Sequence, residues 1–195
     1  MGNTAKFALV SLVLNMAFAL YHLVLSLLSG SWWLLTLGSY YLVLTAVRFV
    51  VLCARKSRSF VVRFTGIMLM ILSVPLVGTV ILSFFCGAGR KYHIIVMIAM
   101  AAYAFAKITL ATVNLIKFRR STSAALVALR NISFADAFAS IFALQRSMLI
   151  TFEGMNEGEI SVMNIALGSA VCITVFLLGC NLTRHKKVLF QFLNP

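Results

Sequence analysis

The sequence predicts an all-α integral membrane protein, a single domain (residues 1–195) built as a bundle of six transmembrane helices. Of its residues 62% are hydrophobic and only 11% are charged, and the mean hydropathy is +1.03. Long stretches contain no Asp, Glu, Lys or Arg, and basic residues gather between them. This composition excludes an ordinary soluble domain, and each apolar stretch reaches the ~20 residues that a helix needs to cross a bilayer.

The first two spans come from one charge-free stretch, Phe7 to Val47. It is about twice as long as one span requires. Ser29, Gly30 and Ser31 lie in its middle and favour a tight turn. Trp32 and Trp33 follow the turn, where an interfacial aromatic belt is expected.

The other four spans are separated by short charged segments. Pro75 lies near the centre of the third span, where it removes a backbone hydrogen bond. Lys107 interrupts the fourth span, and Glu153 begins an acidic loop, Glu153–Glu159, after the fifth. The sixth span contains small residues suited to close helix contacts, among them Gly168 and Gly179. The six spans are expected at about residues 7–28, 32–52, 64–88, 92–116, 122–151 and 160–182.

The distribution of basic residues predicts the orientation. The segments after the second and fourth spans and the tail from Arg184 to Lys187 fall on one side and hold most of the 17 Lys and Arg residues. Cytoplasmic loops carry such an excess, so we expect a multi-pass protein of the cell membrane with both termini inside. The net charge of +13 is explained in the same way, and no nucleic acid is expected as a partner.

Asp136 is the main candidate for a functional residue. It is the one acid of the chain that lies inside an apolar segment, and a carboxylate at bilayer depth is costly enough to indicate a functional site. Lys107 lies about as deep in the fourth span and is the obvious ion-pair partner. The alternative is a proton or cation site in the core of the bundle. Both alternatives stay open at this point.

Three further polar residues of the first two spans need an explanation. His22 is either a core or interface histidine or part of a proton relay. Tyr40 belongs to a polar stripe on the second span, which predicts hydrogen bonds between helices. Arg48 is close to the inner end of that span, and its side chain is expected to extend to the headgroups. The stripe consists of Ser39, Tyr40, Tyr41 and Thr45.

Two segments resemble the cation diffusion facilitator transporters. Asn15 to Ser31 is similar to the first hairpin of that family, with its Ser-Gly-Ser turn. Phe134 to Ser140, which reads Phe-Ala-Asp-Ala-Phe-Ala-Ser, is similar to its fifth helix. The resemblance implies six spans, cytoplasmic termini and, by analogy, a two-fold homodimer.

The same resemblance implies a metal site with ligands from the second and fifth helices, two on each at a spacing of four. The matching positions here are Tyr40, Leu44, Ile132 and Asp136. Only Asp136 retains a ligand of the family, since Leu and Ile cannot bind zinc and a neutral Tyr binds it poorly. We therefore expect a degenerate relative without a metal site and without the family's cytoplasmic domain.

Two functions follow from these observations. The first is a transporter-like membrane protein that moves a small cation or a proton-coupled solute other than zinc. The alternative is a non-transporting membrane subunit or scaffold, such as a substrate-binding subunit of an uptake system. No cofactor and no enzymatic activity are expected, because the chain has no nucleophile with a base nearby and no Gly-rich phosphate loop. The lipid bilayer is the expected partner.

Overall fold

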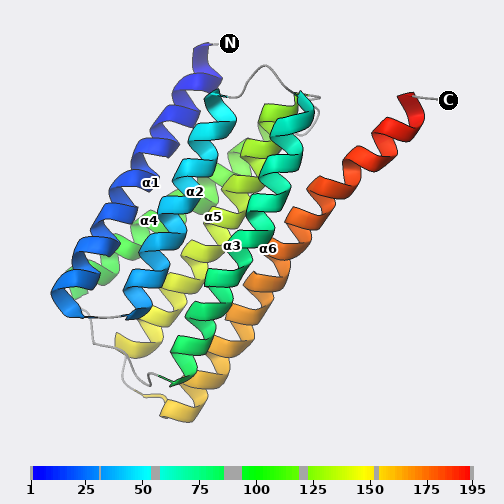
Figure 1. Cartoon of the computed structure of the whole chain (residues 1–195). Coiled ribbons are helices and arrows are strands. Elements are labelled where there is room, and N and C mark those ends of the chain that lie inside the picture. Colours follow the sequence, from blue (N-terminus) through cyan, green and yellow to red (C-terminus); the bar gives the residue numbers. More distant parts are fainter. Residues whose placement is uncertain are drawn as a thin grey trace.

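The computed structural model describes residues 2–30, 32–53, 58–85, 94–118, 123–151 and 154–193. All regular structure in these ranges is α-helical, so the prediction of an all-α fold is confirmed. The helices are arranged as one bundle (Figure 1). Their bounds are α1 (Gly2–Ser29), α2 (Trp32–Cys53), α3 (Arg58–Phe85), α4 (Ile94–Phe118), α5 (Ala124–Thr151) and α6 (Glu157–Leu193).

The surface and the lengths of the helices are those of a membrane bundle. Four of them, α2, α3, α5 and α6, are long and apolar enough to cross a membrane. The other two contain shorter apolar stretches, Asn15–Leu28 in α1 and Met97–Val113 in α4. Large hydrophobic side chains are exposed along the bundle, for example Leu27, Val74 and Ile98. Such a surface suits contact with lipid.

Several helices extend past the expected spans. Helix α3 begins at Arg58 and continues through Pro75, and α6 continues to Leu193, well past the expected end at residue 182. Nothing between Thr183 and Leu193 breaks a helix, since this segment contains neither Gly nor Pro. The expected ends at residues 86–88, 92–93 and 122 lie outside the described residues.

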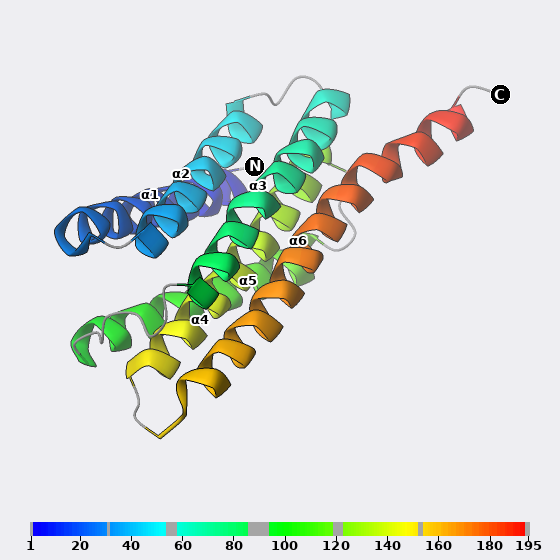
Figure 2. The same cartoon turned by 60° about the horizontal axis from the view of Figure 1, so that its bottom comes forward.

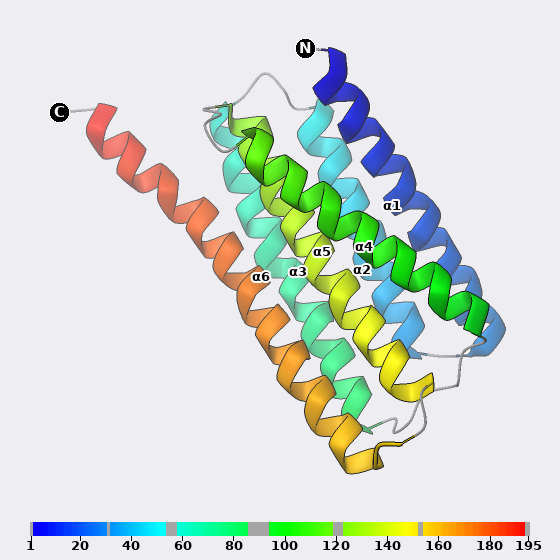
Figure 3. The same cartoon turned by 180° about the vertical axis from the view of Figure 1, so that it is seen from behind.

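The helices pack in pairs around α5. Helix α1 packs on α2, α3 on α6, and α4 on α5, while α5 also contacts α2, α3 and α6. Helices α3 and α6 run side by side in Figures 1 and 2, and α4 crosses α5 obliquely in Figure 3. The start of α1 and the end of α6 lie at the same end of the bundle (Figure 1).

The central helix α5 is buried on most of its circumference. It reaches this position because many of its buried residues are alanines, which let neighbouring helices approach closely. Its buried face also carries polar and charged side chains. The centre of the bundle is therefore lined by small residues and by polar residues. The buried alanines are Ala124, Ala128, Ala135, Ala137, Ala139 and Ala143.

The acidic segment before α6 is partly helical rather than a loop. Glu157 and Glu159 lie in the first turn of α6, where negative charge interacts favourably with the helix dipole. The Asn156 N–H donates to Glu159 Oε2 at 3.1 Å, and the Ile160 N–H donates to the Asn156 carbonyl at 3.1 Å. The first bond is the Glu159 half of a capping box, and the second is the first backbone bond of the helix. Glu153 lies outside the described residues.

Gly30 ends α1 in the left-handed backbone conformation, with φ 63°. This agrees with the predicted turn, because glycine adopts that conformation after a helix without a Cβ penalty. Gly30→Ala is expected to lower the free energy of unfolding by about 1 kcal/mol. Gly158→Ala, at an open position of α6, is the matched control. Reversible unfolding in mixed micelles measures both, and equal effects would contradict the backbone explanation.

Candidate functional site

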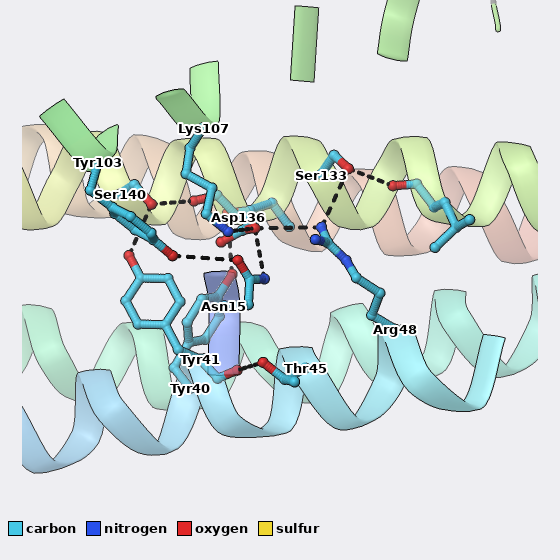
Figure 4. A network of polar contacts seen from close by, with 12 residues as sticks. Asn15, Tyr40, Tyr41, Thr45, Arg48, Tyr103, Lys107, Ser133, Asp136 and Ser140 are labelled. Atoms are coloured by element: carbon cyan, nitrogen blue, oxygen red, sulfur yellow. Dashed lines mark hydrogen bonds and ion pairs between the residues drawn. The ribbon is translucent and has the colours of Figure 1, made fainter. Parts of the chain in front are cut away.

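Asp136 lies near the middle of α5 and is almost completely buried, with 1% of its surface exposed. Side chains from α1, α2 and α4 converge on it (Figure 4). Three of them contact the same carboxylate oxygen, Oδ2. A carboxylate at this depth requires such partners, because the surrounding hydrocarbon offers none.

Lys107 is the partner from α4. Its Nζ forms an ion pair with Asp136 Oδ2, and only 3% of the side chain is exposed. The ammonium group also lies 5.0 Å from the centre of the Tyr103 ring, one helical turn earlier on α4. That contact adds a cation–π attraction on a second side of the charge. The structure therefore brings together the two residues that the sequence placed at similar depth.

Arg48 is the partner from α2, and the prediction that it extends to the headgroups is wrong. It is 1% exposed, with Nη2 3.4 Å from Asp136 Oδ2 and 3.3 Å from Ser133 Oγ. A guanidinium stays buried at this position because the antiparallel helix α5 supplies a carboxylate opposite it. A signal existed in the sequence: Tyr41, Thr45 and Arg48 recur at i, i+4 and i+7, on one face of a helix.

Asn15 is the partner from α1, and it was missed as a site residue. It is fully buried, and its Nδ2 donates to Asp136 Oδ2 at 2.8 Å. Its Oδ1 accepts from the Tyr103 hydroxyl at 3.4 Å. An amide inside an otherwise apolar span could have marked it, because such side chains usually bond to another helix.

The two oxygens of Asp136 differ in their surroundings. Oδ2 accepts a hydrogen bond from Asn15 and forms ion pairs with Arg48 and Lys107. The buried Oδ1 has no hydrogen-bond partner among the described residues. Two cations therefore share one oxygen of one carboxylate. With all three groups ionised, this cluster of Arg48, Lys107 and Asp136, here called the Asp136 cluster, carries a net charge of +1.

Tyr40 and Tyr41 join α2 to α5 without touching the carboxylate. The Tyr40 hydroxyl donates to the Ala135 carbonyl at 3.2 Å, and the Tyr41 hydroxyl lies 3.1 Å from Ser140 Oγ. Ser140 in turn donates to the Asp136 carbonyl at 2.8 Å. These contacts fix the rotation of α2 against α5. The rest of the predicted stripe, Ser39 and Thr45, bonds within α2.

His22 lies beside this site rather than in it. It is fully buried, and its Nδ1 donates to the Phe18 carbonyl at 3.0 Å. Its ring contacts Phe18, Tyr21 and Tyr41, and its Nε2 has no hydrogen-bond partner within the described ranges. Phe18 also stacks on Tyr103, with ring centres 3.4 Å apart. His22 is thus connected to the site through aromatic contacts, by Phe18 to Tyr103 and by Tyr41.

Arg146 is a further buried cation of α5. It is 2% exposed and lies over the Trp33 ring, 4.8 Å from its centre. It is ten residues from Asp136, or about 15 Å along the helix. The assignment of Trp33 to an interfacial belt is therefore wrong, because its ring is buried against Arg146, whereas Trp32 is 70% exposed.

The four positions that the sequence resemblance matched to metal ligands of the cation diffusion facilitators are all buried in the core. Their side chains are Tyr40, Leu44, Ile132 and Asp136. Among the residues that the structure describes, no group of three His, Cys, Asp or Glu side chains could hold a metal ion. Asp136, the one carboxylate among these four positions, contacts Asn15, Arg48 and Lys107 instead.

Comparison with known proteins adds no relative. No protein-family model, curated protein or solved structure matches the chain. The geometry of the Asp136 cluster is therefore the main indication of function.

Proposed function

We propose that this chain is a membrane transporter in which Asp136 carries the coupling proton. The observation that supports it is the convergence of donors from α1, α2 and α4 on one oxygen of a carboxylate of α5. Buried carboxylates in membrane bundles commonly serve proton or ion transfer. Here the carboxylate also connects four helices, so a change of its charge acts on all of them.

Protonation of Asp136 would weaken its attraction to Lys107 and Arg48 together. The ion pairs hold α4 and α2 against α5, so their loss favours a different arrangement of the helices. A ligand that binds one of two such arrangements better shifts the population between them. In this proposal the proton is that ligand, and the obliquely crossing helix α4 is the element that moves.

The charge of the cluster argues against a metal or other small cation as the transported species. Arg48 and Lys107 already exceed Asp136 by one positive charge, and a further cation would add repulsion in a medium that screens it poorly. The transported species that we propose is therefore a solute whose movement is coupled to that of a proton. The cell membrane, cytoplasmic termini, two-fold homodimer and degenerate relationship to the cation diffusion facilitators are parts of the same proposal.

Proton flux into liposomes tests this function. Protein is reconstituted with pyranine inside, and acidification is followed after inward gradients of a panel of small solutes are applied. Wild type is expected to acidify the lumen, and Asp136→Asn is expected to lower the initial rate at least tenfold. Glu157→Gln, the same chemical change at an exposed residue, should retain the wild-type rate, and Asp136→Glu should retain part of it.

A second candidate function is a non-transporting membrane subunit. The observation in its favour is that Asp136, Lys107 and Arg48 are each at most 3% exposed, as in an ion pair that only holds a bundle together. This alternative predicts no solute-dependent proton flux in the wild type, with monodisperse, helical protein. Equal flux in wild type and Asp136→Asn would remove Asp136 from transport altogether.

A further inference from the structure

We infer that the solute is a small monovalent anion that binds to Lys107 and Arg48 in place of the Asp136 carboxylate, while Asp136 takes up a proton. This inference rests on the proposed function and adds the substrate class. It starts from the two cations of the Asp136 cluster, whose donor groups point at one small volume, the position of Asp136 Oδ2 (Figure 4).

The charges inside the bundle favour an anion. Among the described residues, the buried charged side chains are three cations, Arg48, Lys107 and Arg146, and one acid, Asp136. The described glutamates, Glu157 and Glu159, are exposed. Buried charges need compensation, and a bound anion supplies a negative charge where the described residues provide only one.

An anion at these donors would lie within a few ångströms of Asp136. Two negative groups so close together repel each other, and a proton on one of them removes the repulsion. Asp136 has a place for that proton, because its buried Oδ1 has no hydrogen-bond partner in the described parts of the chain. The proton can bond at Oδ1 while the Asn15 amide stays on Oδ2, and Lys107 and Arg48 pass from Oδ2 to the anion.

The exchange conserves charge. Before it, Asp136 carboxylate, Lys107 ammonium and Arg48 guanidinium sum to +1. The anion A⁻ and one proton then enter, an O–H bond forms at Oδ1, and A⁻ takes the ion pair with Lys107 and Arg48. The sum is still +1, so no net charge is added to the hydrocarbon region, where such an addition is costly. Anion and proton therefore move together.

The neighbouring side chains set the size of the anion. Arg48 offers a planar fork of N–H groups, which suits planar oxyanions such as carboxylate and nitrate. Leu44 and Tyr41, on the same helix as Arg48, are fully buried, and Tyr103 covers Lys107. A compact monovalent oxyanion fits this description better than a bulky or divalent one.

Anion binding is measured first, in detergent, as the shift of the unfolding midpoint with nitrate or lactate at constant ionic strength set with gluconate. The unfolding midpoint of the wild type is expected to rise by several degrees. For Asp136→Asn, the anion concentration that gives half of the full shift is expected to be at least ten times lower, since the competing carboxylate is gone. Lys107→Met should lose the shift. Arg63→Gln, which removes an exposed cation, should behave as wild type.

Equal shifts in all four proteins would overturn the inference, because they would show only unspecific binding to the surface. A shift with sulfate as large as with nitrate at equal concentration would also contradict it. If Asp136→Asn does not fold, the wild type alone still decides the question through proton uptake, as follows.

Proton uptake is measured with wild type in weak buffer and a pH indicator. Addition of nitrate is expected to take up close to one proton per bound anion, so that the apparent affinity rises up to tenfold for each unit by which the pH falls. Binding without proton uptake overturns the inference.

The groups that face Asp136 are Arg48, Tyr40 and Tyr41 of α2, Lys107 and Tyr103 of α4 and Asn15 of α1, with Cys172 of α6 beside Tyr40.

The liposome assay separates the two proposals. Proton flux that needs Asp136 but proceeds equally with nitrate, lactate and uncharged solutes would overturn the anion while leaving the transporter. Anion binding with proton uptake but without flux would support the anion site and reject transport.

Discussion

Asp136→Leu is expected to lower the free energy of unfolding by about 3–5 kcal/mol. The change leaves two buried cations, Lys107 and Arg48, without the carboxylate that both contact. Removing one partner of a buried ion pair is more damaging than the pair is stabilising, because the remaining charge keeps its desolvation penalty. Two such charges remain here, which makes this the largest effect expected from a single substitution.

A triple variant shows whether that explanation is correct. Asp136→Leu combined with Lys107→Met and Arg48→Met contains no charge in the cluster and is expected to regain most of the lost stability, since apolar residues of similar volume often replace buried ion pairs at little cost. Reversible unfolding in mixed micelles measures each variant. Glu157→Leu, at an exposed residue, loses only an interaction with the helix dipole and should change the free energy by less than about 1 kcal/mol. Strictly additive losses would contradict the shared ion pair.

The depth of a residue along its helix was predictable from the sequence. This is why Lys107 and Asp136 could be predicted to form a pair. Each apolar span has two ends, so counting from them places Lys107 and Asp136 near the middle of neighbouring spans. Two antiparallel helices joined by a short segment bring residues of equal depth to the same level. The six helices were predictable for the same reason, because hydrocarbon thickness sets their length.

Rotation about a helix axis was not predictable by counting, and this explains the missed and misplaced residues. Arg48 is close enough to a helix end to reach the headgroups, and only the packing of α2 on α5 turns it inward. To predict that Asn15 belongs to the site, one would need to know which face of α1 meets α4 and α5. Trp33 points into the bundle and its neighbour Trp32 points out, a difference of one residue that composition cannot resolve.

The contact between α3 and α6 shows the same limit. Small residues on the sixth span predicted a close approach, but not its partner. In the structure Gly179 of α6 faces Gly66 of α3, and Gly168 faces Val80 and Phe142. Ser169 and Ala170, small residues that follow Gly168 directly, are exposed. Only those small residues that lie at a close contact with another helix have a structural reason to stay small.

Gly179→Ala is therefore expected to lower the free energy of unfolding by about 1–3 kcal/mol. A Cβ at residue 179 would lie 2.8 Å from the Gly66 carbonyl oxygen and 3.1 Å from the Met70 backbone nitrogen. Neither is the movable end of a side chain, so the helices would have to separate along their length. In an open helical position the same change is favourable, because alanine has the higher helix propensity.

Gly78→Ala provides that comparison within the same helix pair. Gly78 lies inside α3, and a Cβ there would meet nothing within 4 Å. This variant is expected to be neutral or to gain up to about 1 kcal/mol, measured by the same unfolding titration. Loss of stability in both variants would point to a general effect of glycine in these helices. Loss in Gly179→Ala alone identifies the backbone contact of α3 with α6 as the cause, independently of the Asp136 cluster.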